Sequence, residues 1–285
     1  MILKTPTFRI FQKNPSFSLM LLIGILSIGC KGDHKKDNVE VQIEASDSNL
    51  SEAQKLVNKT ITHYGGMKNW ESKKSLSYVK TIQSYDSMGG LIRTVAQSHK
   101  YQLKPSFKAN MSWEQDGNKH EIVNNGNQSW KLVNGKIQED KASVDNAWNS
   151  SFGSHYMVSM PFKLKDPGTI LNYEGVDTLS NNRIVHKLKV DYEKGAGSCG
   201  GMHTWNYFLN TDTYQFEANF LNHGEGYSYT DYETFIQIDS ILVTKERKLY
   251  ASNKNMELTY LKTQYSNSDI QFDVELPEEL FKVNN

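Results

Sequence analysis

The chain has 285 residues, which is enough for one large β-rich domain or two small ones with a substantial buried core. It has 32 Lys and Arg residues against 32 Asp and Glu residues, and residues 1–29 hold three of the basic residues and no acid. The remainder therefore carries 29 basic against 32 acidic residues. A weakly acidic chain without a basic block argues against a nucleic-acid partner.

The first residues have the features of an export signal. Lys4, Arg9 and Lys13 precede an apolar run over residues 17–29. This run is shorter than the roughly 20 apolar residues that a membrane-spanning helix needs, and charged residues follow it at once. Its end, Leu-Ser-Ile-Gly-Cys, resembles the bacterial lipobox, in which a peptidase cuts before a cysteine that receives lipid. We therefore predict lipidation of Cys30, with cleavage and secretion without a lipid as the alternative.

The cysteine content agrees with lipidation. The chain has two cysteines, Cys30 and Cys199, so a lipidated Cys30 leaves Cys199 without an intramolecular disulfide partner. Residues 30–50 are polar and largely lack helical or strand periodicity, which is typical of a flexible tether. The sequence thus predicts a signal peptide over 1–29, a tether over 30–50 and one β-rich domain over 51–285. Cys30 would anchor this domain to the outer membrane, on its periplasmic or its surface side.

Residues 51–64 have the clearest helical pattern in the chain. Ser51 and Gln54 form a capping box, and Gly65 and Gly66 provide the left-handed exit that ends a helix. Apolar or small residues recur at the i, i+3, i+4, i+7 spacing of one buried stripe. These residues are Ala53, Leu56, Val57, Thr60, Ile61 and Tyr64.

Most of the chain after residue 70 alternates between apolar and polar residues, as strands do. In residues 107–114 this alternation gives one dry and one wet face. Asp116-Gly117, Asn125-Gly126 and Asn134-Gly135 are hairpin signals spaced nine residues apart, which predicts a tight antiparallel meander. The predicted fold is mainly β with one principal α-helix, in which a single curved antiparallel sheet, a half-open β-barrel, packs on helix 51–64.

Residues 141–168 interrupt the strand pattern. A short helix is predicted near residues 144–152, and Pro161 excludes the following apolar stretch from a central strand. Two interpretations stay open for this interruption. It forms a lid or second helical layer over the sheet, or it is an ordinary crossover packed on the core.

The chain shows no recognisable catalytic motif. It has neither a G-x-S-x-G sequence nor a clear Cys–His pair, so we expect no enzymatic activity and no cofactor. The glycine-rich residues 195–201 lack the spacing of a phosphate-binding loop and are typical of a hairpin loop. His203 and His223 lie at the outer ends of a predicted hairpin, which makes them candidate neighbours. A metal site with Cys199 and Glu225 is not expected, because the C-x₃-H spacing matches no zinc knuckle.

Aromatic residues and methionines recur on one parity of several predicted strands. Met111 and Trp113 share one strand, and Phe216 and Phe220 share another. A curved sheet has more apolar inner face than one helix covers, so either loops fill the remainder or a cavity is left for an apolar ligand. The candidate ligand-binding residues are Met111, Trp113, Trp130, Met157, Phe162, Trp205, Phe216 and Phe220.

Several motifs together resemble a known family. They are Ala53, Leu56 and Val57, His63-Tyr64-Gly65-Gly66, the stretch Met-Pro-Phe-Lys-Leu-Lys-Asp-Pro at 160–167, and His203-Thr204-Trp205 after the glycine-rich loop. This layout resembles an uncharacterised group of flavobacterial lipoproteins and, more distantly, the lipoprotein-localisation carrier (LolA-like) superfamily. The latter resemblance implies a half-open β-barrel with helices on its concave side and an apolar cavity that holds acyl chains. It implies no catalytic residues.

The sequence therefore predicts an envelope lipoprotein that binds or carries a lipid-like or other apolar ligand in a concave cavity. The alternative is an envelope interaction or scaffold lipoprotein with a filled core, no small-molecule ligand and an unknown protein partner. A third hypothesis, a hydrolase, requires His155, His203 and His223 to converge with carboxylates in one cleft.

Overall fold

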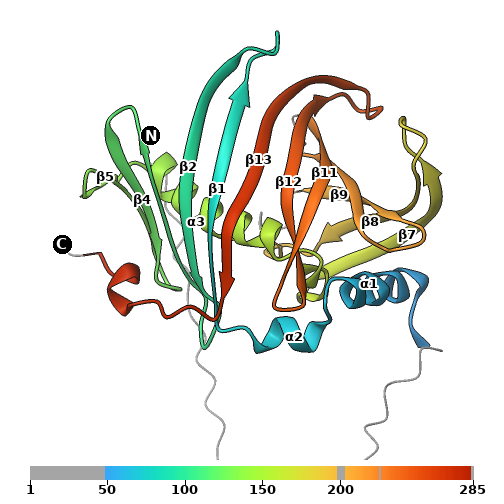
Figure 1. The fold of residues 1–285 in the computed structure, drawn as a ribbon, viewed down its shortest axis with the longest axis horizontal. Coiled ribbons are helices and arrows are strands. Elements are labelled where there is room, and N and C mark those ends of the chain that lie inside the picture. Colours follow the sequence, from blue (N-terminus) through green and yellow to red (C-terminus); the bar gives the residue numbers. More distant parts are fainter. Residues whose placement is uncertain (1–48, 198–202, 225, 284–285) are drawn as a thin grey trace, which may run out of the picture. The chain divides into compact units, whose positions relative to one another are not determined.

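One antiparallel sheet of 13 strands makes up most of the structure (Figure 1). The computed structural model describes residues 49–197, 203–224 and 226–283. The strand order is β6-β5-β4-β3-β2-β1-β13-β12-β11-β10-β9-β8-β7, so the first and last strands of the chain pair near the centre of the sheet. The strands are β1 (Ser75–Tyr85), β2 (Leu91–Gln102), β3 (Lys108–Gln115), β4 (Asn118–Asn124), β5 (Ser129–Val133), β6 (Lys136–Ile137), β7 (Thr169–Thr178), β8 (Ile184–Tyr192), β9 (Thr204–Asn210), β10 (Phe216–Asn222), β11 (Tyr227–Ile238), β12 (Ile241–Ser252) and β13 (Leu258–Phe272).

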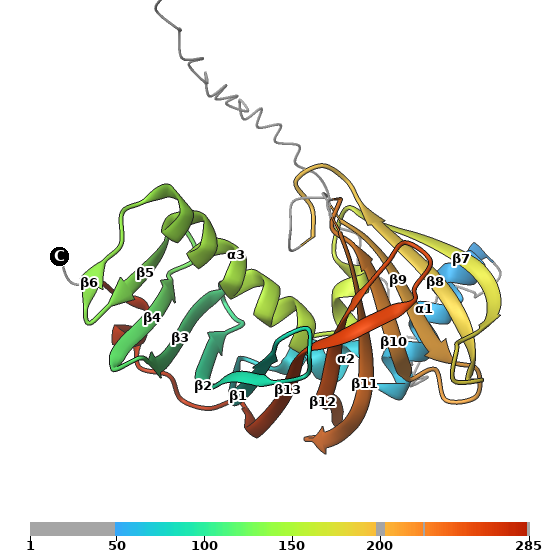
Figure 2. The ribbon, with the colours of Figure 1, turned by 90° about the horizontal axis from the view of Figure 1, so that it is seen from above.

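The sheet curves strongly without closing into a barrel (Figure 2). Strands β6 and β7 form its two edges, and helix α3 (Lys141–Val158) lies on the concave side between them. The predicted fold class is therefore confirmed. No helix in the described ranges is long and apolar enough to cross a membrane.

Helix α1 (Glu52–His63) forms where the sequence predicts it. The Ser51 hydroxyl accepts a hydrogen bond from the Gln54 N–H, and the Gln54 side chain accepts one from the Ser51 N–H, which completes the capping box. Its apolar stripe is buried in the main core against strands of the sheet. Helices α1 and α2 (Met67–Ser72) run along one end of the sheet (Figure 1).

The end of α1 is joined closely to the sheet. Gly65 has a φ of 107°, and a Cβ atom built there would lie 2.0 Å from the carbonyl oxygen of Ser240 in the turn between β11 and β12. The Leu242 N–H donates a hydrogen bond to the Tyr64 carbonyl, and the Phe216 N–H donates one to the Tyr64 hydroxyl. The predicted Gly-Gly exit thus ends the helix and also lets the backbone approach the sheet.

Helix α3 is longer than the short helix predicted near residues 144–152. It spans 18 residues, and the Asp140 carboxylate accepts a hydrogen bond from the Ser143 N–H at its start. Ala147 packs against Met111 and Ile122, and the Asn124 amide donates a hydrogen bond to the Ser151 hydroxyl. The interruption therefore forms a second helical layer over β3, β4 and β5. Up to its last turn the buried residues are Ala147, Ser151 and His155, so α3 lacks the apolar stripe that would have indicated its length.

The segments after α3 and at the end of the chain are short 3₁₀ turns. As expected, the stretch that contains Pro161 forms no strand, and η2 (Phe162–Lys165) follows the proline with Phe162 buried. Near the end of the chain lies η3 (Glu278–Phe281), where the Leu280 carbonyl accepts a hydrogen bond from the Asn110 amide of β3.

Candidate functional site

A cavity of about 200 Å³ lies on the concave side of the sheet, between the last turn of α3 and strands β9 to β13. Neighbouring strands build its wall in register, because Trp205 pairs with Leu221, and Leu221 pairs with Ser228. We call it the concave cavity. Its apolar lining consists of Met157, Trp205, Leu221 and Leu249. Its polar lining consists of Asn219, His223, Ser228, Thr230, Arg247, Lys262 and Tyr265.

Two cations lie over one ring beside this cavity. Arg247 is only 7% exposed, and its Cζ atom lies 4.3 Å from the centroid of the Tyr265 ring. The Nζ atom of half-buried Lys80 lies 5.1 Å from the same centroid. Within the described ranges, no carboxylate oxygen lies within 4.0 Å of a side-chain nitrogen of either residue. Among the described residues, the lining of the concave cavity also contains no Asp or Glu. No ion pair between described residues therefore neutralises the positive charge.

The neighbouring titratable groups respond to this charge. Burial and then the Arg247 charge lower the pKa of Lys80 to about 7. Burial, followed by the charges of Lys80 and Arg247, holds the pKa of His99 well below its usual value. Both shifts disfavour further positive charge here, which is the expected response of cations without a carboxylate partner.

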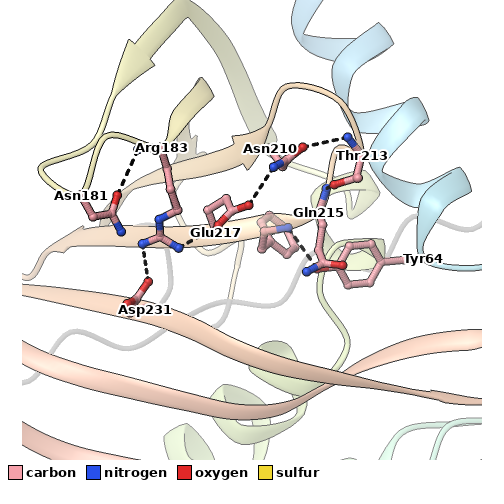
Figure 3. A network of polar contacts seen from close by, with 9 residues as sticks. Tyr64, Asn181, Arg183, Asn210, Thr213, Gln215, Glu217 and Asp231 are labelled. Atoms are coloured by element: carbon pink, nitrogen blue, oxygen red, sulfur yellow. Dashed lines mark hydrogen bonds and ion pairs between the residues drawn. The ribbon is translucent and has the colours of Figure 1, made fainter.

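Arg183, which directly precedes β8, differs from Arg247 because it has carboxylate partners. Arg183 donates to the Glu217 carboxylate at 2.7 Å and to the Asp231 carboxylate at 2.6 Å (Figure 3). The other oxygen of Glu217 accepts a hydrogen bond from the Asn210 amide. Asp231 and the concave-side residue Tyr232 are adjacent in β11, so Asp231 lies on the opposite face. Arg183 thus has two carboxylate partners, whereas buried Arg247 has none among the described residues.

A second, larger cavity lies on the other side of the end of α3. It has a volume of about 440 Å³, and its aromatic lining consists of Trp70, Phe107, Phe152, His155 and Tyr156. We call it the aromatic pocket. The His155 ring lies 4.9 Å from the Phe107 ring, and its Nε2 atom has no hydrogen-bond partner among the described residues. Burial, together with the Lys163 charge, lowers the pKa of His155 to about 3, so this imidazole is neutral at physiological pH.

Three of the sequence-predicted ligand residues lie at or beside these two cavities, and a fourth lies in the main core. Met157 and Trp205 line the concave cavity. Phe162 stacks on Trp70, which lines the aromatic pocket. Phe216 is buried in the main core, and its ring lies 5.2 Å from the Tyr207 ring.

Three other predicted residues lie in the opposite half of the sheet. Met111 is buried beneath α3, and Trp113 stacks on His120. Trp130 lines a separate cleft of about 680 Å³ between the β5–β6 edge and α3, together with Val144 and Trp148. The structure does not bring these three residues to the concave cavity.

Phe220 lies on the other face of the sheet from Phe216. The parity of β10 predicts a shared face, but the β9–β10 pairing shifts between Phe216 and Ala218. Because a β-bulge reverses the alternation beyond it, Phe220 packs in a separate cluster with Phe208 and Tyr229. The expectation that Phe216 and Phe220 share one face is corrected here.

Arg247 and Lys80 were not predicted from the sequence. Ile241 and Val243 of β12 are buried in the main core, but the pairing with β11 skips Lys245 before it reaches Arg247. Because such a bulge reverses the alternation, the parity of β12 in the sequence does not identify Arg247 as inward-facing.

The histidines do not converge on one centre. His203 and His223 are neighbours, as proposed from the hairpin, with ring centroids 5.4 Å apart. His155 lies in the aromatic pocket instead. Cys199 and Glu225, like Cys30, lie outside the described residues. The described part of the chain contains no group of three or more His, Cys, Asp or Glu residues that could hold a metal ion.

Solved structures with the same fold come from different bacteria. A DUF1329 family protein from Desulfovibrio piger is 11% identical with a TM-score of 0.51, and a LolA superfamily protein from Nitrosomonas europaea is 10% identical with a TM-score of 0.52. Each match covers 82% of this chain and 98% of the other chain. At such low identity these matches show a shared fold alone. The predicted resemblance to the LolA-like fold is therefore confirmed at the level of architecture.

The family assignment comes from the sequence. No curated protein matches the chain. A family model described as a family of unknown function (DUF6503) matches residues 41–277. Because this match covers well over half of the chain, the protein belongs to the DUF6503 family.

Proposed function

We propose that the protein binds and carries a lipid-like or other apolar ligand, non-covalently, on the concave side of its sheet. The observation that carries this proposal is that α1 and α3 leave the concave side incompletely filled. A cavity remains on each side of the end of α3, with Met157 lining one and Tyr156 lining the other. The fold shared with a LolA superfamily protein supports the same proposal.

The aromatic pocket is suited to an apolar chain. Its volume of about 440 Å³ falls within the roughly 300–1,000 Å³ typical of ligand sites. Its side chains hold each other in place, since Phe107 stacks on Phe152 with ring centroids 4.7 Å apart. A preformed apolar wall lowers the ordering cost of binding. The concave cavity is smaller, and the charged residues described in its lining, Arg247 and Lys262, are both basic, so it is suited to the end of a ligand that carries polar groups.

The anchoring role of Cys30 is part of the same proposal. Several acyl chains on one cysteine would bind a membrane almost permanently, because each buried CH₂ group contributes about 0.8 kcal/mol. The protein would then present its domain near the outer membrane, on a tether over residues 30–50. Replacing Cys30 with Ser should move the protein out of the membrane fraction and abolish metabolic labelling with a radioactive fatty acid. Unchanged membrane association of the variant would contradict lipidation at this position.

Ligand binding is tested with the full chain extracted in a mild detergent. We expect native mass spectrometry to show a co-purified lipid and expect uptake of a fluorescent acyl probe. Leu249→Trp adds an indole to the wall of the concave cavity and should reduce uptake. Gln237→Trp adds the same group at an exposed position of β11 and serves as the control. Absence of both lipid and probe from the wild-type protein would overturn the proposal.

One observation favours the alternative, a lipoprotein that binds an envelope protein. The edge strand β7 has an unpaired side, and Ile170, Val176 and nearby Ile184 are 49%, 59% and 57% exposed. Exposed apolar residues on an edge strand favour the addition of a partner strand. Cross-linking from position 176 in intact cells would recover an envelope protein under this alternative, whereas a monomeric product would contradict it.

A further inference from the structure

We infer that the ligand of the concave cavity carries an acidic head group, a carboxylate or a phosphate, which the Arg247 guanidinium binds. The inference rests on the proposed function and narrows it from an apolar ligand to an anionic amphiphile. The observations that carry it are an arginine without a carboxylate partner, an apolar wall beside it and an unpaired acceptor atom in the same wall.

The first observation is that Arg247 is buried and has no carboxylate partner among the described residues. Arg247 is more than nine-tenths buried and lines a cavity that has no Asp or Glu among the described residues of its lining. A buried charge without a counter-ion is costly, because the protein replaces little of the hydration that the charge has lost. Stacking on Tyr265 offsets part of that cost but supplies no anion. The fork of N–H donors therefore matches a planar carboxylate or a phosphate that comes from outside the chain.

The second observation is that the cavity lining combines apolar residues with positively charged ones. Met157, Trp205 and Leu221 form an apolar side of the cavity, and Arg247 and Lys262 supply positive charge to its lining. A free inorganic anion would gain nothing from the apolar side, whereas a molecule with an acyl chain and an acidic end contacts both. The geometry thus favours an anionic amphiphile over a small anion.

The third observation concerns Asn219, which is 1% exposed and lines the same cavity. Its amide nitrogen donates to the Tyr232 hydroxyl at 2.8 Å, but its Oδ1 atom has no hydrogen-bond partner among the described residues. A buried acceptor is normally paired. A hydroxyl group on the ligand head, such as that of a glycerol unit, would supply the missing donor. We expect a head group that combines an oxyanion with a hydroxyl to bind most tightly.

Exposed basic residues mark the entrance. Lys262 and His223 line the cavity and are exposed, so they stand at its rim. A rim that includes a lysine attracts an anionic head group over a longer range than contact distance, and this attraction weakens as salt is added. The buried Arg247 would then provide the specific contact.

The test compares the binding of amphiphiles with and without an acidic head group. Displacement of a bound fluorescent acyl probe from the full chain is measured for palmitate, its uncharged methyl ester and palmitoyl-lysophosphatidylglycerol, with inorganic phosphate as a further competitor. We expect the two acidic amphiphiles to bind about tenfold to a hundredfold more tightly than the ester, which is the usual contribution of a charge-assisted contact. Inorganic phosphate should not displace the probe.

Variants at position 247 test whether this difference in affinity depends on Arg247. Arg247→Gln should remove most of the preference for palmitate over its ester, and Arg247→Lys should restore part of it. Lys248→Gln removes one positive charge on the opposite face of the same strand and should leave the preference unchanged, with folding of each variant checked by circular dichroism and melting temperature. Equal binding of palmitate and its ester by the wild-type protein would overturn the inference and leave the proposed function standing. Displacement of the probe by inorganic phosphate as well as by palmitate would have the same meaning. Binding of no amphiphile would overturn both.

Discussion

The indole ring of Trp70 lies parallel to the phenyl ring of Phe162, with 4.7 Å between ring centroids and an interplanar angle of 2°. Trp70 belongs to α2, and Phe162 begins the turn η2 that follows α3. The stack therefore connects the helices at the end of the sheet with the helical layer on its concave side. It also fixes Trp70, one wall of the aromatic pocket.

Removal of the Phe162 ring should destabilise the whole domain. Phe162 is 3% exposed, so Phe162→Ala leaves a cavity and should lower the free energy of unfolding by about 3–5 kcal/mol. Urea unfolding followed by tryptophan fluorescence measures this loss. The control is Met88→Ala, at a residue that is 94% exposed, which should change stability by about 0.5 kcal/mol or less. Similar unfolding midpoints for the two variants would contradict the role of the stack.

The two glycines after α1 should differ in their sensitivity to substitution. Both have positive φ, so an alanine at either position is strained by about 1–3 kcal/mol. Gly65→Ala also places its Cβ atom 2.0 Å from the backbone oxygen of Ser240, whereas nothing lies within 4 Å of a Cβ atom at Gly66. We therefore expect the melting temperature to fall further for Gly65→Ala than for Gly66→Ala. A larger effect at Gly66 would be inconsistent with the close approach described here.

His155 should make the domain less stable in mild acid. Its pKa is about 3 in the folded chain, against an ordinary value of about 6.5 for an unfolded histidine. Between these two values the unfolded state binds the additional proton, so the contribution is fully present above pH 6.5 and is lost as the pH falls towards 3. From pH 7.5 to pH 5 the loss from this residue is about 2 kcal/mol.

The measurement for His155 is a series of denaturant titrations across that range of pH. His155→Phe keeps an aromatic ring in the pocket and removes the proton-binding site, so its stability should fall less between pH 7.5 and pH 5. Parallel pH profiles for the wild-type and variant proteins would show that His155 is accessible to protons in the folded state.

Arg247 should lower the stability of the ligand-free protein. Replacing a buried charge that lacks a counter-ion with an apolar side chain of similar length removes the desolvation cost, so Arg247→Met should raise the free energy of unfolding by about 1 kcal/mol. The lost contact with Tyr265 works in the opposite direction. Thermal unfolding of delipidated protein provides the comparison, with Lys248→Met as the control. Destabilisation by Arg247→Met alone would mean that the arginine has a structural role.

The elements predicted well from the sequence are those whose signals are local. Helix α1 has a capping box, an apolar stripe and a Gly-Gly exit within 16 residues, and each of these features is present in the structure. The full length of α3 was not predicted, because the buried residues before its last turn are Ala147, Ser151 and His155, and none of them is a large apolar residue. Contacts with β3 and β4 determine which face of α3 is buried, and these contacts cannot be predicted from a short stretch of sequence.

The candidate site was predicted in part for a similar reason. Alternation identified Trp205, and the apolar stretch that interrupts the strand pattern contains Met157; both residues line the concave cavity. Phe220 was misplaced because a bulge reverses the alternation in β10, and a bulge depends on the pairing with the neighbouring strand. Arg247 was not predicted, because a bulge in β12 interrupts the alternation before it and the presence or absence of a carboxylate partner depends on the neighbouring strands.

The central claim is that a lipid-like ligand occupies the concave side of the sheet. Photo-cross-linking with a palmitate analogue that bears a diazirine in its chain tests this claim most directly, with the labelled positions mapped by mass spectrometry. The account predicts labels at Met157, Trp205 and Leu249, or on the rings of the aromatic pocket, and their loss when unlabelled palmitate competes. Labels confined to exposed positions such as Ile170 and Val176, unaffected by the competitor, would contradict it.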